Sequence, residues 1–427
     1  YQSHIVDKRC SAFVCKDLVG APCQSACPLG TEVWRYAAHI ARGEYEEAYL
    51  AIRESNPFPS VCARVCDHKC EQHCRLGTTG QDPLAIRALK RFVTDNVDPG
   101  VFRPKRTEAS NGKKVAVVGA GPAGLTAAHC LSLQGYAVTV LDAGSEPGGM
   151  LTLGIPSFRL PRDVLRKEIA GLLDDNITLE MNTELGKDFS VDQLFDNGFQ
   201  AVFLALGSLQ SRRLNVDGED AVNVYSSMEF LREFNSSGRS LARGHVGVIG
   251  GGNSAVDAAR IALRQEEVDK VTILYRRTRE EMPAFAEEID AAVAEGVRLE
   301  TLLSPLEVHS DHGKVKGVEL IRNELGDRDD SGRRRPVAVP GTEHTIRVDT
   351  LIVAIGETPD TGNLGESKSA GIETAKWGAI QVEPHTMATG RPGVFAGGDV
   401  VTGPNTVVDA IAAGKKVALM IDRYLKG

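Results

Sequence analysis

The stretch KKVAVVGAGPAGLTAAHCLSLQGYAVTVLDAG, residues 113–144, decides the fold of this chain. It consists of an apolar run, a glycine-rich turn, a helical pattern and a second apolar run, an order typical of a β-α-β unit. In the turn, Gly119 permits a tight bend, Gly121 lets the backbone approach a pyrophosphate and Gly124 lets the helix pack closely on the strand. Asp142 ends the second run, where a carboxylate can accept from ribose hydroxyls. The stretch therefore predicts a dinucleotide site.

A second stretch, GHVGVIGGGNSAVDAARIALRQEEVDKVTILYRR at residues 244–277, has the same order of elements. Its glycine turn keeps Gly252 for close backbone approach and has Ala255 at the third position, which the fingerprint allows. Each unit is later followed by a buried-strand pattern that ends in a glycine, AVFLALGS at 201–208 and TLIVAIGE at 350–357. This internal repeat predicts two dinucleotide-binding domains of one type.

The two units differ at the position of the ribose carboxylate. The position that matches Asp142 holds Tyr275, and Arg276 and Arg277 follow it. Without the carboxylate a 2′-phosphate is not repelled, and guanidinium groups can bind it bidentately. The second unit is therefore expected to bind NADP rather than NAD. The alternative is a solvated edge on which the arginines pair with the two glutamates that follow them.

A third feature lies near the C-terminal end, in GVFAGGDVVTGPNTVVDAIAAGKKVA at residues 393–418. A buried-strand pattern ends at Gly398 and Asp399, and a helical pattern begins near Thr406. The N-terminal end of such a helix can stabilise negative charge that develops on a reduced flavin ring. The first dinucleotide site is therefore expected to hold a flavin.

Composition narrows the class of protein. The chain has 427 residues and a formal net charge of -8, and it lacks the basic stripe that a nucleic-acid surface needs. No apolar run reaches the length of about 18 residues that a transmembrane helix needs, and no signal-peptide pattern begins the chain. The length predicts two or three domains. A soluble, cytoplasmic protein without a transmembrane segment is expected.

Eight of the nine cysteines gather near the N-terminal end, at Cys10, Cys15, Cys23, Cys27, Cys62, Cys66, Cys70 and Cys74. In a long chain of intracellular character such clusters are more often metal ligands than disulfides. Cys27 precedes Pro28, as in the cysteine runs of bacterial ferredoxins, which indicates iron-sulfur ligation. Zinc is the competing interpretation, because structural zinc sites also use closely spaced cysteine pairs. The ninth cysteine, Cys130, is expected to be a small core residue.

The run VCARVCDHKCEQHC, residues 61–74, spaces four cysteines evenly. On one straight helix their sulfurs would rotate by about 40° per step and span about 18 Å along the axis. A single cubane cluster cannot collect all four at that separation. Either the four ligands are shared between two clusters, or the segment bends sharply.

The motifs GAGPAG, PGGMLTLGIPSFRLP, YRRTREEMP and GGDVVTGPNTVVDAI, behind a cysteine-rich block, resemble the two-dinucleotide-domain flavoproteins that include thioredoxin reductase. The match is closest to the glutamate synthase small-subunit type, which also forms the N-terminal part of dihydropyrimidine dehydrogenase. The resemblance covers nearly the whole chain and implies an α/β fold with two Rossmann-like domains. A helical iron-sulfur domain with two 4Fe-4S clusters would occupy residues 1–105. The FAD-binding domain would comprise residues 112–210 and 355–427, and the inserted NADP(H)-binding domain residues 211–354.

The resemblance also implies site residues. The FAD contacts would be Gly119, Gly121, Gly124, Asp142, Gly149, Met150, Arg159, Gly207, Gly398, Asp399 and Thr406. The nicotinamide-nucleotide contacts would be Gly252, Asn253, Ser254, Arg276, Arg277 and Gly356. No catalytic acid or base is singled out, because hydride transfer between two cofactors needs placement and electrostatics. Thioredoxin-reductase chemistry needs a cysteine pair beside the flavin, and no cysteine follows Cys130.

For the clusters, the resemblance implies one set of ligands at Cys10, Cys15, Cys23 and Cys74, and three ligands of the other cluster at Cys27, Cys66 and Cys70. Members of the family place a Gln or Glu in the helix IRALKRF as the fourth ligand, and the matching position here is Lys90. An ammonium group has no lone pair to donate to iron. Cys62 is therefore the hypothetical fourth ligand.

The expected function is that of an NADPH-dependent oxidoreductase, a metal-binding flavoprotein for electron transfer. Hydride would pass between NADP(H) and FAD in electron pairs, and single electrons would pass through two clusters to a partner subunit or an attached domain. One alternative is a self-contained NAD(P)H-dependent reductase of a small substrate. Another is a zinc-bearing scaffold subunit without catalytic activity.

Overall fold

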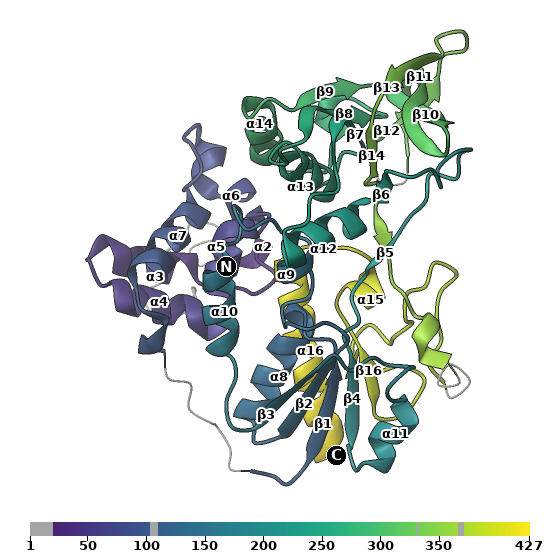
Figure 1. Ribbon diagram of the computed structural model, residues 1–427. Coiled ribbons are helices and arrows are strands. Elements are labelled where there is room, and N and C mark those ends of the chain that lie inside the picture. Colours follow the sequence, from purple (N-terminus) through teal and green to yellow (C-terminus); the bar gives the residue numbers. More distant parts are fainter. Residues whose placement is uncertain (1–19, 103–109, 330–331, 366–370) are drawn as a thin grey trace. The chain divides into compact units, whose positions relative to one another are not determined.

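The computed structural model describes residues 20–102, 110–329, 332–365 and 371–427, and the chain divides into two compact units (Figure 1). The predicted ligands Cys10 and Cys15 lie outside the described residues. The first unit comprises Tyr1–Gly148, Arg159–Gly207 and Thr361–Gly427, and the second comprises Gly149–Phe158 and Ser208–Asp360. No helix among the described residues is long and apolar enough to cross a membrane.

A parallel five-stranded sheet organises the dinucleotide-binding part of the first unit (Figure 1). In sheet order its strands are β16 (Val394–Ala396), β4 (Ala201–Leu204), β1 (Lys114–Val118), β2 (Ala137–Asp142) and β3 (Ile177–Met181). Strands β4 and β16 are buried at every residue, as expected where helices cover both faces of a parallel sheet. Helices α8 (Pro122–Leu133) and α16 (Val407–Lys426) pack so closely that a Cβ at Gly414 would lie 2.2 Å from the Ala123 carbonyl oxygen.

The second unit repeats this arrangement with a second parallel sheet. In sheet order its strands are β6 (Val224–Ser226), β14 (Thr350–Val353), β7 (Gly244–Ile249), β8 (Val268–Tyr275) and β9 (Arg298–Thr301). Helices α12 (Ser227–Ser237) and α13 (Asn253–Ala262) pack against each other beside it. First and second strands of each β-α-β unit occupy equivalent places in the two sheets. The predicted α/β class with two Rossmann-like domains is therefore confirmed.

The second unit also contains an antiparallel sheet that the sequence analysis missed. Its strands are β10 (Leu303–Asp311), β11 (Lys314–Arg328), β12 (Arg334–Ala338) and β13 (His344–Arg347). Val308 and Val318 of this sheet share a buried core with Ile249, Leu274 and Leu351 of the parallel sheet. A short antiparallel pair, β5 (Gln210–Ser211) and β15 (Glu357–Thr358), completes the unit.

The described N-terminal block is helical, as predicted. Its elements are α2 (Pro22–Ala26), α3 (Val33–Ala41), α4 (Tyr45–Ser55), α5 (Pro59–Val65), α6 (Lys69–Gln72), η2 (Arg75–Thr79), α7 (Ile86–Asn96) and η3 (Pro99–Val101). Tyr36, Tyr49, Ile52 and Val93 form the centre of its core. The remaining short elements of the chain are α9 (Met150–Leu153), α10 (Arg162–Ala170), α11 (Val191–Asp196), η4 (Arg279–Glu281), α14 (Ala286–Ala294) and α15 (Asp399–Thr402).

Glu168 ties the helical block to the rest of the first unit. This buried carboxylate lies on α10 and accepts hydrogen bonds from the backbone N–H groups of Ser60 and Val61, each at 2.7 Å, at the start of α5. Lys415 of α16 donates to the backbone oxygen of Ser55 at 2.7 Å. The cysteine-bearing helices are thereby held against α10 and α16.

The change Glu168→Ala is expected to destabilise the first unit by about 2–4 kcal/mol, because two buried N–H groups lose their acceptor. Urea unfolding followed by circular dichroism measures the loss. The matched control is Glu54→Ala, which removes an exposed carboxylate paired with Arg35 at 2.6 Å and should cost less than about 1 kcal/mol. Equal losses in the two variants would contradict this role of Glu168.

Candidate functional site

The first glycine loop, between β1 and α8, has the geometry that a pyrophosphate needs. Gly119 has φ +113, and a Cβ there would lie 2.3 Å from the Ala205 carbonyl oxygen. A Cβ at Gly124 would lie 1.9 Å from the Gly119 oxygen. At Gly121, by contrast, φ is −77° and a Cβ would meet no atom within 4 Å. Neither the backbone nor packing demands glycine at Gly121, so the open space there suits a ligand that approaches the backbone closely.

Asp142 ends β2 beside this loop, as the sequence predicts. One carboxylate oxygen accepts from the backbone N–H of Ala120 and the other from that of Gly144, each at 2.6 Å. The carboxylate thus shapes the loop, and each oxygen keeps a lone pair for a ribose hydroxyl.

Further predicted flavin contacts follow strands of the same sheet. Gly207 comes after β4 with φ +74, and a Cβ there would meet no atom within 4 Å. Gly398 comes after β16 with φ +76 and precedes Asp399, the first residue of α15. Because β1, β4 and β16 are parallel neighbours, these loops meet the first glycine loop at one edge of the sheet. Thr406 caps α16, since its hydroxyl oxygen accepts from the Asp409 N–H at 3.3 Å.

Three further predicted flavin contacts lie in the segment between β2 and α10. Gly149, with φ +53, precedes Met150 at the start of α9, and both belong to the second unit. Arg159 begins the next segment of the first unit. Gly148, the residue before Gly149, donates its backbone N–H to the Ala120 oxygen of the first glycine loop at 2.8 Å. The role of Gly149, Met150 and Arg159 remains a prediction.

The second glycine loop repeats the geometry of the first. Gly250 has φ +148, and a Cβ there would lie 2.1 Å from the Ala354 oxygen. Gly252, which precedes α13, again has open space where its Cβ would be. Next to it the Asn253 side chain accepts from the Phe285 N–H at 3.1 Å, and the Ser254 side chain hydrogen-bonds the buried Glu357 carboxylate.

A pocket of about 630 Å³ lies over this loop and is rich in arginine. Gly250, Gly252 and Gly356 line it, together with Arg212, Arg213, Arg276, Arg277 and Arg333. Burial lowers the pKa of Arg276, and the positive charges of Arg277 and Arg333 act in the same direction. An anion in the pocket would relieve this repulsion.

The two predicted arginines differ in their contacts. Arg277 is 3% exposed; its guanidinium donates to the Arg334 backbone oxygen at 2.7 Å and to the Asp329 carboxylate at 2.6 Å. Arg276 is exposed and lines the pocket. Of the glutamates in the solvated-edge alternative, Glu281 pairs with Arg334 at 2.9 Å. Arg276 is therefore the better placed of the two to bind a 2′-phosphate, and Arg333 is a lining residue that the sequence analysis missed.

The cysteine run is bent. Helix α5 ends at Val65, His68 adopts a left-handed conformation with φ +38, and α6 begins at Lys69. The bend that the sequence analysis gave as one of two alternatives is therefore present, and a straight helix over residues 62–74 is excluded. The six described cysteines of this block are free thiols.

Electrostatic neighbours indicate a division of the described cysteines, with Cys27 a neighbour of both sets. Lys90, on α7, is 7% exposed, and its charge interacts most strongly with the sulfurs of Cys66, Cys62, Cys27 and Cys70, in that order. Cys23 interacts with Cys74 and then with Cys27. The first four are called the Lys90 group below.

Two observations bear on what these sulfurs can bind. In the described ranges no three of the cysteine sulfurs lie within 4.8 Å of one another, whereas bonds of about 2.3 Å to one zinc ion would bring them within about 4 Å. The Tyr36 hydroxyl is fully buried, has no hydrogen-bond partner among the described residues, and faces Cys70, Cys27 and Cys23. Because buried hydroxyls are normally hydrogen-bonded, an acceptor beside these sulfurs is implied. The wider spacing and the unsatisfied hydroxyl both fit an iron-sulfur cluster.

Burial disfavours ionisation of the three thiols Cys62, Cys66 and Cys70. It raises the pKa of Cys70 to about 12, and it also raises the pKa of Cys66 and Cys62, with the Lys90 charge opposing the shift in each case. Metal binding must displace these protons, so cluster assembly releases them to solvent.

The cysteine segment contacts the N-terminal turn of α16. Lys69, beside Cys70, places its ammonium 3.1 Å from the Asp67 carboxylate and 3.5 Å from that of Asp409. The same Asp409 donates its backbone N–H to the Thr406 hydroxyl that caps α16. The Lys90 group therefore lies close to the helix end predicted to face the flavin.

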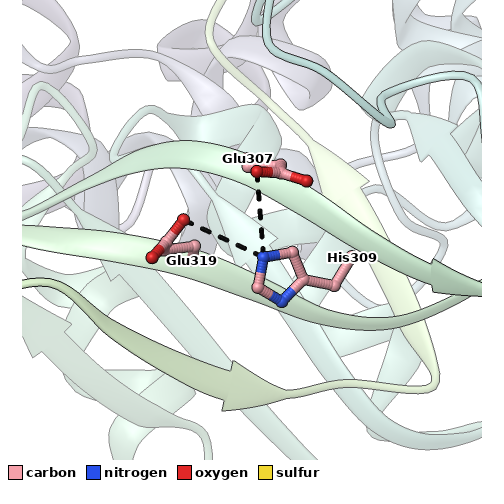
Figure 2. Close-up of side chains that lie close together, drawn as sticks. All are labelled: Glu307, His309 and Glu319. Atoms are coloured by element: carbon pink, nitrogen blue, oxygen red, sulfur yellow. Dashed lines mark ion pairs between the residues drawn. The ribbon is translucent and has the colours of Figure 1, made fainter.

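A polar cluster on the antiparallel sheet is separate from these sites (Figure 2). His309 Nε2 lies 4.0 Å from a Glu307 oxygen and 3.9 Å from a Glu319 oxygen. The register places Glu307 directly opposite Glu319, and like charges so placed repel. The His309 ring lies within 4.0 Å of both carboxylates, and these contacts account for the cluster without a ligand.

Two family models match the chain. The model described as pyridine nucleotide-disulphide oxidoreductase matches residues 113–414. The model described as dihydropyrimidine dehydrogenase domain II, 4Fe-4S cluster, matches residues 4–99.

Two similar proteins match nearly the whole chain. The β subunit of an NADP(+)-dependent formate dehydrogenase from Moorella thermoacetica is 43% identical over 436 residues, covering 96% of this chain and 61% of the relative. The NADPH glutamate synthase small chain from Escherichia coli is 35% identical over 422 residues, covering 95% of this chain and 88% of the relative. This chain therefore spans about three fifths of the length of the formate dehydrogenase subunit and most of that of the glutamate synthase chain.

Among solved structures, FprA from Mycobacterium tuberculosis in complex with NADPH matches with a TM-score of 0.62 and 20% identity, over 74% of this chain and 84% of that one. At that identity the likeness shows the fold alone.

Proposed function

This chain belongs to the pyridine nucleotide-disulphide oxidoreductase family, and on that premise we propose that it is an electron-transfer module that links NADPH, FAD and two 4Fe-4S clusters. The family resemblance predicted from the motifs is confirmed. The module would lie in the cytoplasm.

The observation that carries the proposal is the contact between the cysteine segment and α16. The ammonium of Lys69 lies 3.5 Å from Asp409 in the first turn of that helix, and Glu168 and Lys415 hold the same block against α10 and α16. Electron transfer requires that donor and acceptor be held close together. These contacts would place the Lys90 group beside the flavin.

The residues of the first sheet edge would hold FAD. The open space at Gly121 would admit the pyrophosphate, the α8 N-terminus would stabilise its charge, and Asp142 would bind the ribose. Thr406 and the α16 N-terminus would stabilise negative charge on the ring. FAD, when bound, accepts a hydride, which carries two electrons, and releases these electrons one at a time to the clusters. We retain the domain boundaries 1–105, 112–210, 211–354 and 355–427 as part of this proposal.

Each of the two sets of cysteines would hold one cluster. The Lys90 group, Cys27, Cys62, Cys66 and Cys70, would hold one cluster, and Cys23 and Cys74 would hold the other together with Cys10 and Cys15. The relatives named above are a subunit and a chain of larger enzymes by their names. We therefore propose that electrons leave to, or arrive from, a partner subunit or an attached domain.

Composition of the purified chain tests the proposal. One FAD and about eight irons per chain are expected, together with the broad visible absorption of a flavin and iron-sulfur protein. A colourless protein that contains zinc instead would support the scaffold alternative and contradict the electron-transfer function.

NADPH would bind in the arginine-rich pocket, with Arg276 on the 2′-phosphate. Arg276→Ala is expected to raise the KM for NADPH about tenfold to a hundredfold, because a charged hydrogen bond worth about 1.5–3 kcal/mol is lost. The kcat and the KM for NADH should change little. The control Arg279→Ala removes an exposed arginine that pairs with Asp290 and should leave both KM values unchanged. Equal increases for NADPH and NADH would refute the 2′-phosphate contact.

A further inference from the structure

Lys90 is buried in a way that the protein alone does not explain. It lies on the apolar face of α7 with Ile86, Val93 and Thr94, and it is 7% exposed. In the described part of the chain no ion pair joins it to a carboxylate, and the charged groups that act on it most strongly are the four sulfurs of the Lys90 group. Burial of an ammonium is strongly unfavourable unless negative charge compensates it. Negative charge at these four sulfurs would compensate the buried ammonium.

The position of Lys90 relative to the sulfurs is fixed by the backbone around it. A Glu71 carboxylate oxygen accepts from the Arg87 N–H at 2.7 Å, which caps the first turn of α7. The Arg87 guanidinium donates to the Cys66 backbone oxygen at 3.2 Å. Helix α7 also packs against α5, which carries Cys62. The bend between α5 and α6 and helix α7, which carries Lys90, are thus joined by direct contacts.

We propose that Lys90 is the fixed positive charge that raises the midpoint potential of the cluster at the Lys90 group above that of the other cluster. This inference rests on the proposed function. A cluster held by four thiolates is anionic, and uptake of one electron makes it more negative by one charge. A buried cation close to it stabilises the reduced state more than the oxidised one, because the surrounding dielectric is low.

The unequal potentials give the two clusters different roles. Electrons collect at the cluster beside α16, where the Lys69 and Asp409 contact lies, and reach the second cluster only when that site is filled or a partner withdraws them. Lys90 acts through the cluster rather than on a substrate, so it is a positioning residue. It also occupies the place where the resemblance expects a Gln or Glu ligand. The same position would thus have exchanged a ligand for a charge, with Cys62 as the fourth ligand.

Redox titration followed by EPR tests this on the full chain with both clusters assembled. The wild type should show two midpoint potentials, and the higher one should vanish in Cys70→Ala. In Lys90→Met the higher potential should fall while the lower one stays unchanged. A fall of 59 mV corresponds to a tenfold change in the equilibrium constant for one-electron reduction of the cluster. Lys90→Arg, which keeps the charge, should retain the wild-type pattern. Arg91→Met, which removes an exposed charge from the same helix, should change neither potential.

The outcomes separate this inference from the function on which it rests. The inference is wrong if the higher potential remains in Cys70→Ala, because it then belongs to the other cluster. It is also wrong if Lys90→Met keeps its iron and shows both wild-type potentials. If Lys90→Met does not assemble its clusters, the inference is decided by whether the higher wild-type potential disappears in Cys70→Ala. Fewer than two clusters in the reconstituted wild type would instead overturn the proposed function.

Discussion

Cys62→Ala is expected to halve the iron content, from about eight to about four atoms per chain, as one 4Fe-4S cluster is lost. The Cys62 side chain is 1% exposed on α5 and belongs to the Lys90 group. A cubane that loses one of four thiolates in a buried site has no solvent ligand to replace it. Iron analysis and the EPR spectrum of the dithionite-reduced protein measure the effect.

The control for this prediction is Cys130→Ala. Cys130 is also a free cysteine, on α8, and does not belong to either sulfur group. It should keep about eight irons. Retention of both clusters in Cys62→Ala would show that the fourth ligand lies elsewhere, and the Lys90 group would then lose its all-cysteine assignment.

Gly121→Val is expected to weaken FAD binding by at least about a hundredfold while the chain stays folded. A Cβ at Gly121 meets no protein atom within 4 Å, so the valine side chain would extend into the space proposed for the pyrophosphate. Loss of two charge-assisted hydrogen bonds at about 1.5–3 kcal/mol each accounts for the magnitude. Flavin absorbance after gel filtration and a denaturation curve measure binding and folding separately.

Gly252→Val is the matched control, because Gly252 holds the equivalent place in the second loop and also has open space around it. It should keep FAD and lose affinity for NADPH. If Gly121→Val retained its flavin, or if Gly252→Val lost it, the assignment of the two cofactors to the two loops would be wrong.

Sequence alone predicted the features that depend on local pattern. The two β-α-β units, their glycine turns and the positions of Asp142 and Tyr275 at strand ends follow from periodicity and spacing, and the strands occur where these patterns predict. The bend in the cysteine run was foreseen as an alternative because helix dimensions are known. It could not be chosen from spacing, since the left-handed His68 has no distinctive sequence signal.

Features that depend on distant residues were not predictable. Arg277 looked equivalent to Arg276, yet its guanidinium is bound to Asp329, fifty-two positions away in the chain. The antiparallel sheet was missed although Val315, Val318 and Leu320 give a partly alternating pattern. Lys90 had a readable signal: it shares helical spacing with Ile86 and Val93, which places a charge on an apolar face. Only the fold shows that four sulfurs lie opposite it.

Electrons from NADPH are expected to reach the cysteine-bound clusters through the flavin. Anaerobic addition of NADPH to the reconstituted chain, followed by absorbance and EPR, tests it most directly. The flavin absorbance should decrease, and a reduced-cluster signal that is absent in Cys70→Ala should appear; NADH should be less effective, and dithionite should bring out the second cluster. Loss of flavin absorbance with no cluster signal under NADPH would contradict the account.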